Sequence, residues 1–258
     1  MELLGEKVDI LGVKIDAVNL ILACQKINHW IKERRKVYIC VAPVSTIVEC
    51  RRDQVYGKII NEADMVTPDG MPLVWLGRLR GHKDMQRTYG PDLMLALCQE
   101  AGLKHFLYGA SEVVLERLQE KLKEYFPSVN IVGHHAPTFS QEVAVESPEI
   151  IDRINASQAD IVWVALGSPK QDFWMHRHRG RLNAPVMIGV GAAFDFLAGV
   201  KPQAPRWVQR IGMEWFFRLC CEPKRLWKRY LIGNTQFLYC LLQDQVRRLT
   251  RQPNGKNE

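Results

Sequence analysis

Short, almost continuously apolar runs alternate with longer amphipathic stretches through the first two hundred residues, and this rhythm constrains the fold most. Strands buried on both faces lack the in–out alternation of a half-exposed sheet, so such runs are typical of parallel strands covered by helices. The predicted strands are Val37–Ala42, Asp64–Thr67, His105–Tyr108, Val129–Val132, Asp160–Leu166 and Val186–Val190. The predicted helices are Val18–Glu33, Met71–Leu79, Asp92–Ala101, Glu112–Tyr125 and Lys170–Arg179. The sequence therefore predicts a doubly wound, mostly parallel, Rossmann-like α/β sheet.

The strand signals stop after Lys201, and the sequence that follows is helical, basic and aromatic. Residues 201–251 hold 11 Lys and Arg against 3 Asp and Glu, whereas residues 1–200 hold 23 against 24. Helices are expected over Trp207–Arg218, Lys224–Leu231 and Thr235–Leu249. We expect three parts: an α/β domain (1–200), a basic helical appendage (201–251) and a disordered tail (252–258).

Composition excludes several classes of protein. Hydrophobic residues make up 47% and charged residues 24% of the chain, so it can bury a core and is not a disordered protein. Seven cysteines without a Cys-x-x-Cys pair favour a reducing compartment over a disulfide framework. The longest apolar run, residues 184–200, contains Asp195 and is shorter than the roughly 20 residues of a spanning helix. With no signal or transit peptide pattern at the N-terminus, the chain is expected to be cytoplasmic.

The appendage suits three kinds of contact. Cations beside Trp and Tyr are typical of a membrane surface with anionic lipid, and also of a groove that binds nucleic acid. The third interpretation is a helical subdomain whose aromatic side chains pack inward. Its aromatic residues are Trp207, Trp215, Phe216, Phe217, Trp227, Tyr230, Phe237 and Tyr239.

Ligands of open α/β sheets bind beyond the carboxyl ends of the strands, so the loops there are the candidate sites. Asp69, after the second predicted strand, is either a general base for a hydroxyl group or a cap of the next helix. Arg87 is expected to pair with a phosphate or with Asp92. Ser111, after Tyr108-Gly109-Ala110, is expected to cap a helix, and this loop offers backbone contacts or a simple turn.

Two further loops carry polar residues. In Gly167-Ser168-Pro169-Lys170-Gln171, Ser168 is expected as N-cap and Pro169 at the first helical position. The free amides there would suit a phosphate and Gln171 a polar ligand, although an ordinary capped loop has the same pattern. Gly189-x-Gly191 lacks the rest of a dinucleotide fingerprint. Asp195 follows it in an apolar run, so this acid holds either a ligand hydroxyl or a structural partner.

Metal and nucleophile motifs are not found in the sequence. No Asp-x-Asp occurs, and His176 and His178 would face apart on a helix. We therefore expect no metal and no cofactor. Two other classes remain as alternatives: a Rossmann-type dinucleotide or S-adenosylmethionine enzyme, and a nucleic-acid-binding protein that uses the basic appendage.

The ordered motifs together resemble the WecG/TagA/CpsF family of bacterial glycosyltransferases. They are TPDGMPLVW, QRTYGPDLM, FLYGAS, VWVALGSPKQDFW, IGVGAAFDFLAG and APRWVQRIGMEWFFRLCCEPKRLWKRYL, between Thr67 and Leu231. The resemblance implies an inverting, metal-independent enzyme that moves a sugar from a UDP-sugar to a saccharide on a polyprenyl diphosphate. It also implies a place at the inner face of the membrane, with the appendage closing the active site and touching anionic lipid.

The resemblance assigns roles to individual residues. Asp69 matches the proposed general base, and Arg87 an arginine near the diphosphate. Gln171 and Asp195 match polar positions of the nucleotide-sugar pocket, which Gly109 and Gly167 would help to form. Arg218, Arg225 and Lys228 match appendage cations that would neutralise the leaving UDP.

One departure concerns the donor sugar. Mannosamine transferases of the family often carry Thr-Pro-Asn after an early strand, where this chain reads Ala42-Pro43-Val44. Ser45 or Thr46 would have to replace the missing polar contacts, so the sequence leaves the donor sugar open. A monomer and a homo-oligomer are both compatible with the sequence.

Overall fold

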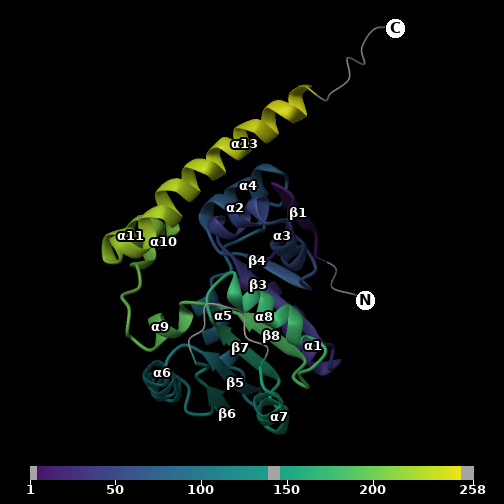
Figure 1. Ribbon diagram of the computed structural model, residues 1–258, viewed down its shortest axis with the longest axis vertical. Coiled ribbons are helices and arrows are strands. Elements are labelled where there is room, and N and C mark those ends of the chain that lie inside the picture. Colours follow the sequence, from purple (N-terminus) through teal and green to yellow (C-terminus); the bar gives the residue numbers. More distant parts are fainter. Residues whose placement is uncertain (1–4, 139–145, 251–258) are drawn as a thin grey trace.

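The computed structural model describes residues 5–138 and 146–250, and a six-stranded parallel sheet lies at its centre (Figure 1). The strands are β3 (Val37–Ala42), β4 (Met65–Pro68), β5 (Lys104–Gly109), β6 (Asn130–His135), β7 (Ile161–Ala165) and β8 (Val186–Gly189). Their order across the sheet is β4-β3-β8-β7-β5-β6, with every neighbouring pair parallel. The predicted doubly wound α/β fold is confirmed, and β3 begins and ends at the predicted residues.

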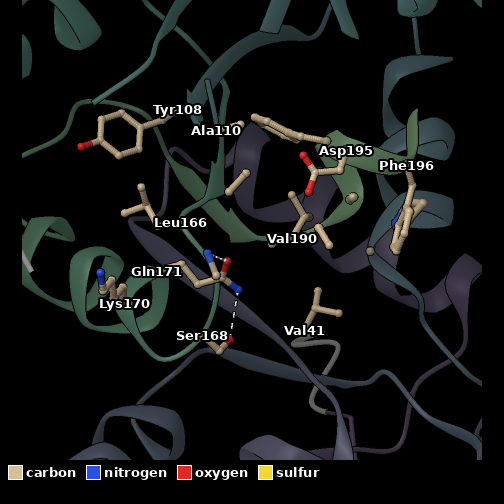
Figure 2. A pocket seen from close by; sticks show the side chains of 18 of the residues that line it. Val41, Tyr108, Ala110, Leu166, Ser168, Lys170, Gln171, Val190, Asp195 and Phe196 are labelled. Carbon is tan, nitrogen blue, oxygen red and sulfur yellow. Dashed lines mark hydrogen bonds between the residues drawn. The ribbon is translucent and has the colours of Figure 1, made fainter. Parts of the chain in front are cut away.

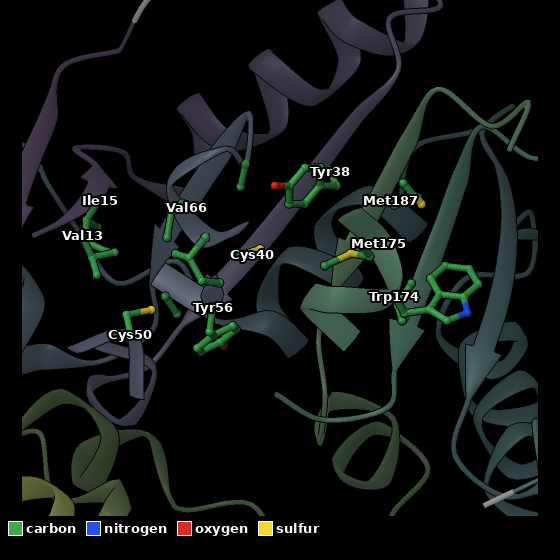
Figure 3. Close-up of a cluster of buried hydrophobic side chains, with 14 of the residues drawn as sticks. Val13, Ile15, Tyr38, Cys40, Cys50, Tyr56, Val66, Trp174, Met175 and Met187 are labelled. Carbon is green, nitrogen blue, oxygen red and sulfur yellow. The ribbon is translucent and has the colours of Figure 1, made fainter. Parts of the chain in front are cut away.

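Helices cover both faces of the sheet, because successive strand residues point to opposite sides. In β3, Tyr38 and Cys40 belong to one buried cluster (Figure 3) and Val37 and Ile39 to the other. The first cluster includes side chains of α2 (Val44–Arg52), α3 (Gln54–Asn61), α4 (Met71–Leu79), α7 (Pro148–Ala156) and α8 (Lys170–His178). The second includes side chains of α1 (Leu20–Lys32), α5 (Gly90–Cys98), α6 (Glu112–Tyr125) and α9 (Ala193–Leu197). The inner strands β3, β7 and β8 therefore have nearly continuous apolar sequences.

Several elements are present that the sequence did not predict. β1 (Lys7–Ile10) and β2 (Val13–Asp16) form an antiparallel hairpin. Its two turn residues, Leu11 and Gly12, both have positive φ angles, 56° and 89°. Such turns normally carry Asn-Gly or Asp-Gly, so leucine at the first position concealed the hairpin. The short helices α2, α3 and α7 were also missed; Asp53 ends α2 and caps α3 at once, which leaves no loop between them.

The appendage consists of helices over its described residues. They are α10 (Arg206–Arg210), α11 (Glu214–Cys221), α12 (Pro223–Trp227), the π-helical stretch η1 (Lys228–Ile232) and α13 (Gly233–Thr250). The single helix predicted over Trp207–Arg218 is wrong, because Gly212 adopts a positive φ of 74° between α10 and α11. A Cβ atom at Gly212 would meet the Trp75 ring at 2.9 Å, so glycine allows this turn to lie against α4.

The long helix α13 packs the appendage against the sheet part of the molecule. It packs against α2, and Figure 1 shows it extending beyond the remaining helices. Phe237 of α13 is buried in the first core cluster. Across the described part of the chain, no helix has both the length and the apolar character needed to cross a membrane.

Candidate active site

A cavity of about 690 Å³ opens at the carboxyl edge of the sheet, and Figure 2 shows the side chains of Tyr108, Gln171 and Asp195 around it. The segments after all six strands of the sheet contribute to its lining: Pro43, Asp69, Ala110, Ala136, Gly167 and Val190. The appendage supplies three arginines to the same lining: Arg218, Arg225 and Arg229. The cavity therefore lies where ligands of doubly wound folds bind, with a cationic wall from the end of the chain.

A second hollow, which we call the apolar groove, encloses about 470 Å³ between α4 and the appendage. Its apolar lining includes Met71, Trp75, Leu76 and Leu79 from α4, and Trp215, Phe237, Leu238 and Leu241 from the appendage. The cavity and the groove share three lining residues: Pro43, Asp69 and Arg218. The two hollows therefore meet at a carboxylate and a guanidinium group.

Asp69 stands directly after β4, where its backbone N–H donates to the Ala42 carbonyl at 3.0 Å. The alternative that Asp69 caps α4 is wrong, because Gly70 is the N-cap and no side chain caps that helix. Arg87 instead donates to the Oδ1 atom of Asp69, from Nε at 3.2 Å and from Nη2 at 2.9 Å. The other oxygen, Oδ2, accepts no hydrogen bond from any described residue, so it is available to a substrate hydroxyl.

Arg87 is enclosed by protein groups and lines the groove. Its Nη2 donates to Glu214 at 2.6 Å, its Nη1 to Gln209 at 3.1 Å, and its guanidinium lies 3.9 Å from the Tyr89 ring centre. Desolvation lowers the pKa of Arg87, but the carboxylates of Asp69 and Glu214 outweigh it and raise that pKa above its ordinary value. Arg87 therefore stays charged.

The predicted pairing of Arg87 with Asp92 is wrong. Asp92 accepts instead from Arg206 at 2.8 Å, in an ion pair between α5 and α10. This pair and the Arg87–Glu214 pair both connect the sheet part of the molecule to the appendage.

The side-chain amide of Gln171 stabilises the loop between β7 and α8. Its Oε1 accepts from the Gly167 N–H at 3.1 Å, and its Nε2 donates to the Ser168 hydroxyl at 3.3 Å (Figure 2). The N-cap of α8 is Pro169, so the predicted N-cap at Ser168 is displaced by one residue. Both Gly167 and Gln171 line the cavity, as the sequence predicts for a ligand loop. The Ser111 prediction is confirmed in position, since Ser111 is the N-cap of α6, although its side chain makes no cap hydrogen bond.

Asp195 lines the cavity from α9, and its side chain is 22% exposed rather than deeply buried. Its partner is Lys201, whose Nζ lies 2.7 Å from Oδ2 and 3.7 Å from a Glu222 oxygen. Lys201 is thus a cavity residue that the sequence reasoning missed.

The other predicted residues lie in different places. Ser45 lines the groove and accepts a hydrogen bond from Arg229 Nε at 2.9 Å, whereas Thr46 is buried and lines neither hollow. Gly109 also lines neither hollow. It has a positive φ of 111°, and a Cβ atom there would lie 2.7 Å from the Ala165 backbone. Lys228 lies 5.5 Å from the Trp227 ring centre and lines neither hollow.

Arg229 is the appendage cation that the sequence reasoning missed. It belongs to η1, whose wider turn changes which side chains face the cavity relative to an ordinary α-helix. Desolvation lowers the pKa of Arg229 below its ordinary value, and the charges of Arg218 and Arg225 lower it further. Mutual repulsion of three guanidinium groups at one wall favours binding of an anion there.

Among the described residues, no group of three or more His, Cys, Asp or Glu side chains is arranged to hold a metal ion. The cationic side chains that line the cavity are Lys170, Lys201, Arg218, Arg225 and Arg229.

The fold and the cationic cavity define an α/β protein with a site for an anionic ligand at the strand ends, and the family match below makes it a transferase. Residues 8–251 match the model of the WecG/TagA/CpsF glycosyl transferase family, and the chain belongs to this family. The resemblance drawn from the motifs is thereby confirmed. Family membership supports the glycosyltransferase prediction over the two alternatives, a dinucleotide or S-adenosylmethionine enzyme and a nucleic-acid-binding protein.

Three relatives share one description, N-acetylglucosaminyldiphosphoundecaprenol N-acetyl-beta-D-mannosaminyltransferase. The relative from Bacillus spizizenii is 32% identical over 205 residues, which cover 78% of this chain and 77% of that protein. The relative from Bacillus subtilis is 27% identical over 234 residues, covering 90% and 89%. The relative from Staphylococcus aureus is 28% identical over 225 residues, covering 85% and 87%.

Proposed function

We propose that this enzyme transfers a hexose or N-acetylhexosamine from a UDP-sugar to a saccharide carried on a polyprenyl diphosphate. The observation that carries the proposal is the position of Asp69, where the cationic cavity and the apolar groove meet. A sugar nucleotide matches the cavity in charge, and an isoprenoid matches the groove in polarity. The printed description of the relatives supports the acceptor class, because it names a diphosphoundecaprenol-linked sugar.

The diphosphate of the donor belongs at the appendage wall of the cavity. Arg218, Arg225 and Arg229 offer guanidinium groups there, and planar guanidinium groups bind phosphate oxygens in pairs. Positive groups fixed around a leaving diphosphate stabilise the negative charge that develops as the glycosidic bond breaks. Arg87 contributes differently, because its donors already bind Asp69, Glu214 and Gln209.

Asp69 is the general base of the proposed reaction. Its Oδ2 takes the proton of the acceptor hydroxyl while the acceptor oxygen bonds to the anomeric carbon. The bond from that carbon to the phosphate oxygen breaks, and UDP leaves with the bonding electrons, which inverts the anomeric centre. Asp195, held by Lys201, and the loop braced by Gln171 lie on the donor side of the cavity and would contact the sugar nucleotide.

The acceptor lipid and the membrane belong on the groove side. Leu238, Leu242 and Val246 are spaced by four residues along α13 and are 61%, 66% and 59% exposed. Leu238 also lines the groove, so this apolar stripe is continuous with it. Exposed apolar stripes beside cations favour a peripheral position on an anionic membrane surface, at its inner face.

The donor sugar is best determined by assay. Ala42-Pro43-Val44 lacks the polar contacts of the mannosamine pattern, and Ser45 is occupied by Arg229. UDP release should be measured for a panel of UDP-hexoses and UDP-N-acetylhexosamines with a polyprenyl-diphosphate-linked saccharide in detergent. Acceptor-dependent release that Asp69→Asn lacks supports the proposal and identifies the sugar. A folded protein that releases no UDP and binds none contradicts it.

A further inference from the structure

Glu214, at the first residue of α11, places a carboxylate beside the proposed base, at the side of Arg87. Its Oε2 accepts from Arg87 Nη2 at 2.6 Å, and the same nitrogen donates to Asp69 Oδ1 at 2.9 Å. The side chains of Arg87 and Glu214 are only 14% and 13% exposed. Two acids, one from the sheet part and one from the appendage, therefore share one largely buried guanidinium.

This sharing determines how Arg87 holds Asp69. A guanidinium facing a carboxylate favours a fork with one bond to each of its oxygens. Here both bonds from Arg87 go to Oδ1 of Asp69, while Nη1 donates to Gln209 and Nη2 also serves Glu214. Glu214 and Gln209 both belong to the appendage, so its docking draws Arg87 away from a two-oxygen fork and leaves Oδ2 free.

We propose that Glu214 is a positioning residue that keeps Asp69 competent as a base, so that docking of the appendage and removal of the acceptor proton are coupled. The inference rests on the proposed function, because it takes Asp69 as the base. Without the docked appendage, Asp69 is the carboxylate partner that remains to Arg87. Arg87 would then donate to both oxygens of Asp69, and the bond to Oδ2 would occupy the lone pair that takes the acceptor proton.

The charges around Asp69 agree with this assignment. Arg87 contacts both Glu214 and Asp69. Tyr89, Tyr230 and Arg218 are further titratable groups, among the described residues, that interact with this acid pair. Burial raises the pKa of Glu214, Arg87 opposes that rise, and the negative charge of Asp69 adds to it. The two carboxylates therefore act on each other through the guanidinium that they share.

The chain offers a matched control for docking alone. Arg206 of α10 binds Asp92 of α5 at 2.8 Å, so this ion pair also connects the appendage to the sheet part. It does so without a hydrogen bond to Arg87 or Asp69 among the described residues. Arg206→Gln therefore removes one docking contact while the bonds from Arg87 to Glu214, Gln209 and Asp69 remain.

The test compares pH–rate profiles of full-length wild type, Glu214→Gln, Glu214→Asp, Arg206→Gln and Asp69→Asn. For Glu214→Gln we expect the acid limb of kcat to move about one pH unit lower, because the charge of Arg87 then acts on Asp69 alone. Its plateau kcat should fall about tenfold, with the Kd for UDP and the melting temperature close to wild type. Arg206→Gln should keep the acid limb of wild type. Glu214→Asp, with its carboxylate drawn back by one carbon, should lie between wild type and Glu214→Gln.

Each arm has a result that overturns the inference. An acid limb of Glu214→Gln that coincides with wild type, or an equal shift in Arg206→Gln, reduces Glu214 to a docking contact. If Glu214→Gln does not melt cooperatively, Glu214→Asp decides, and a wild-type profile there has the same meaning. Full activity of Asp69→Asn removes the proposed base itself, whereas an inactive Asp69→Asn beside an unchanged Glu214→Gln overturns only the inference.

Discussion

The cavity and the apolar groove are both lined by Asp69 and differ in the side chains that make up the rest of their walls. The cavity is walled by strand-end loops and by appendage guanidinium groups. The groove combines Leu, Trp and Phe side chains of α4, α11 and α13 with polar side chains that include Arg87 and Glu214. A cationic wall in one hollow and an apolar wall in the other, with a carboxylate common to both, fit an enzyme that binds an anionic donor and a lipid-linked acceptor. The predictions below test this division, from the largest expected effect to the smallest.

Removing the carboxylate where the hollows meet should have the largest effect. Asp69→Asn keeps the size of the side chain but cannot take a proton, so kcat should fall by about 10²–10⁴-fold. Binding of UDP, measured by calorimetry, should change little, because the cationic wall remains. Asp92→Asn, which alters another acid beside the appendage, serves as the control. Normal turnover of Asp69→Asn would show that another group is the base.

Removing the guanidinium of Arg218, which lines both hollows, should have the second largest effect. Arg218 lines both hollows and lies 5.2 Å from the Phe196 ring centre. Arg218→Ala should lower kcat by about 10²-fold, as loss of one positioned charge at a leaving group does, and should weaken UDP binding. Steady-state kinetics with varied donor would show both changes. A variant with a normal kcat would place the leaving diphosphate elsewhere in the cavity.

A change confined to the groove should affect only the lipid substrate. Leu238→Ser shortens a side chain that lines the groove, and we expect the KM for a polyprenyl acceptor to rise about tenfold. The Kd for UDP should stay unchanged. Ile21→Ser, at another exposed apolar residue on a helix, is the matched control. Equal KM values for a long-chain and a short-chain acceptor in the wild type would contradict the division.

The smallest expected effect is the difference in UDP binding between variants of the neighbouring cations Arg229 and Lys228. Arg229→Ala should weaken UDP binding by about tenfold, because its guanidinium lines the cavity, whereas Lys228→Ala should stay within about twofold. Calorimetry with UDP alone is sufficient. The opposite order would mean that the turn through η1 orients these side chains differently when the ligand is bound.

The sequence predicted the sheet well, because its signals are local. The helices α4 and α6 begin and end at the predicted residues, and the strand-end position of Asp69 followed from the order of elements. The partners of Asp69 could not be predicted in this way. Arg87 and Glu214 are 127 residues apart in the chain, and only the folded appendage brings them together. The choice of Arg229 over Lys228 depends on a π-helical turn, which leaves no signal in hydrophobic periodicity.

The three residues that the cavity and the groove share have a consequence for inhibition. Because Pro43, Asp69 and Arg218 line both hollows, the cavity and the groove are adjacent, and we expect one linked ligand to reach both. A nucleoside diphosphate joined to a short isoprenoid would combine the two binding energies and lose overall rotation and translation only once. We expect such a bisubstrate compound to bind more tightly than either half, and Asp69, at the joint, sets the length of the linker.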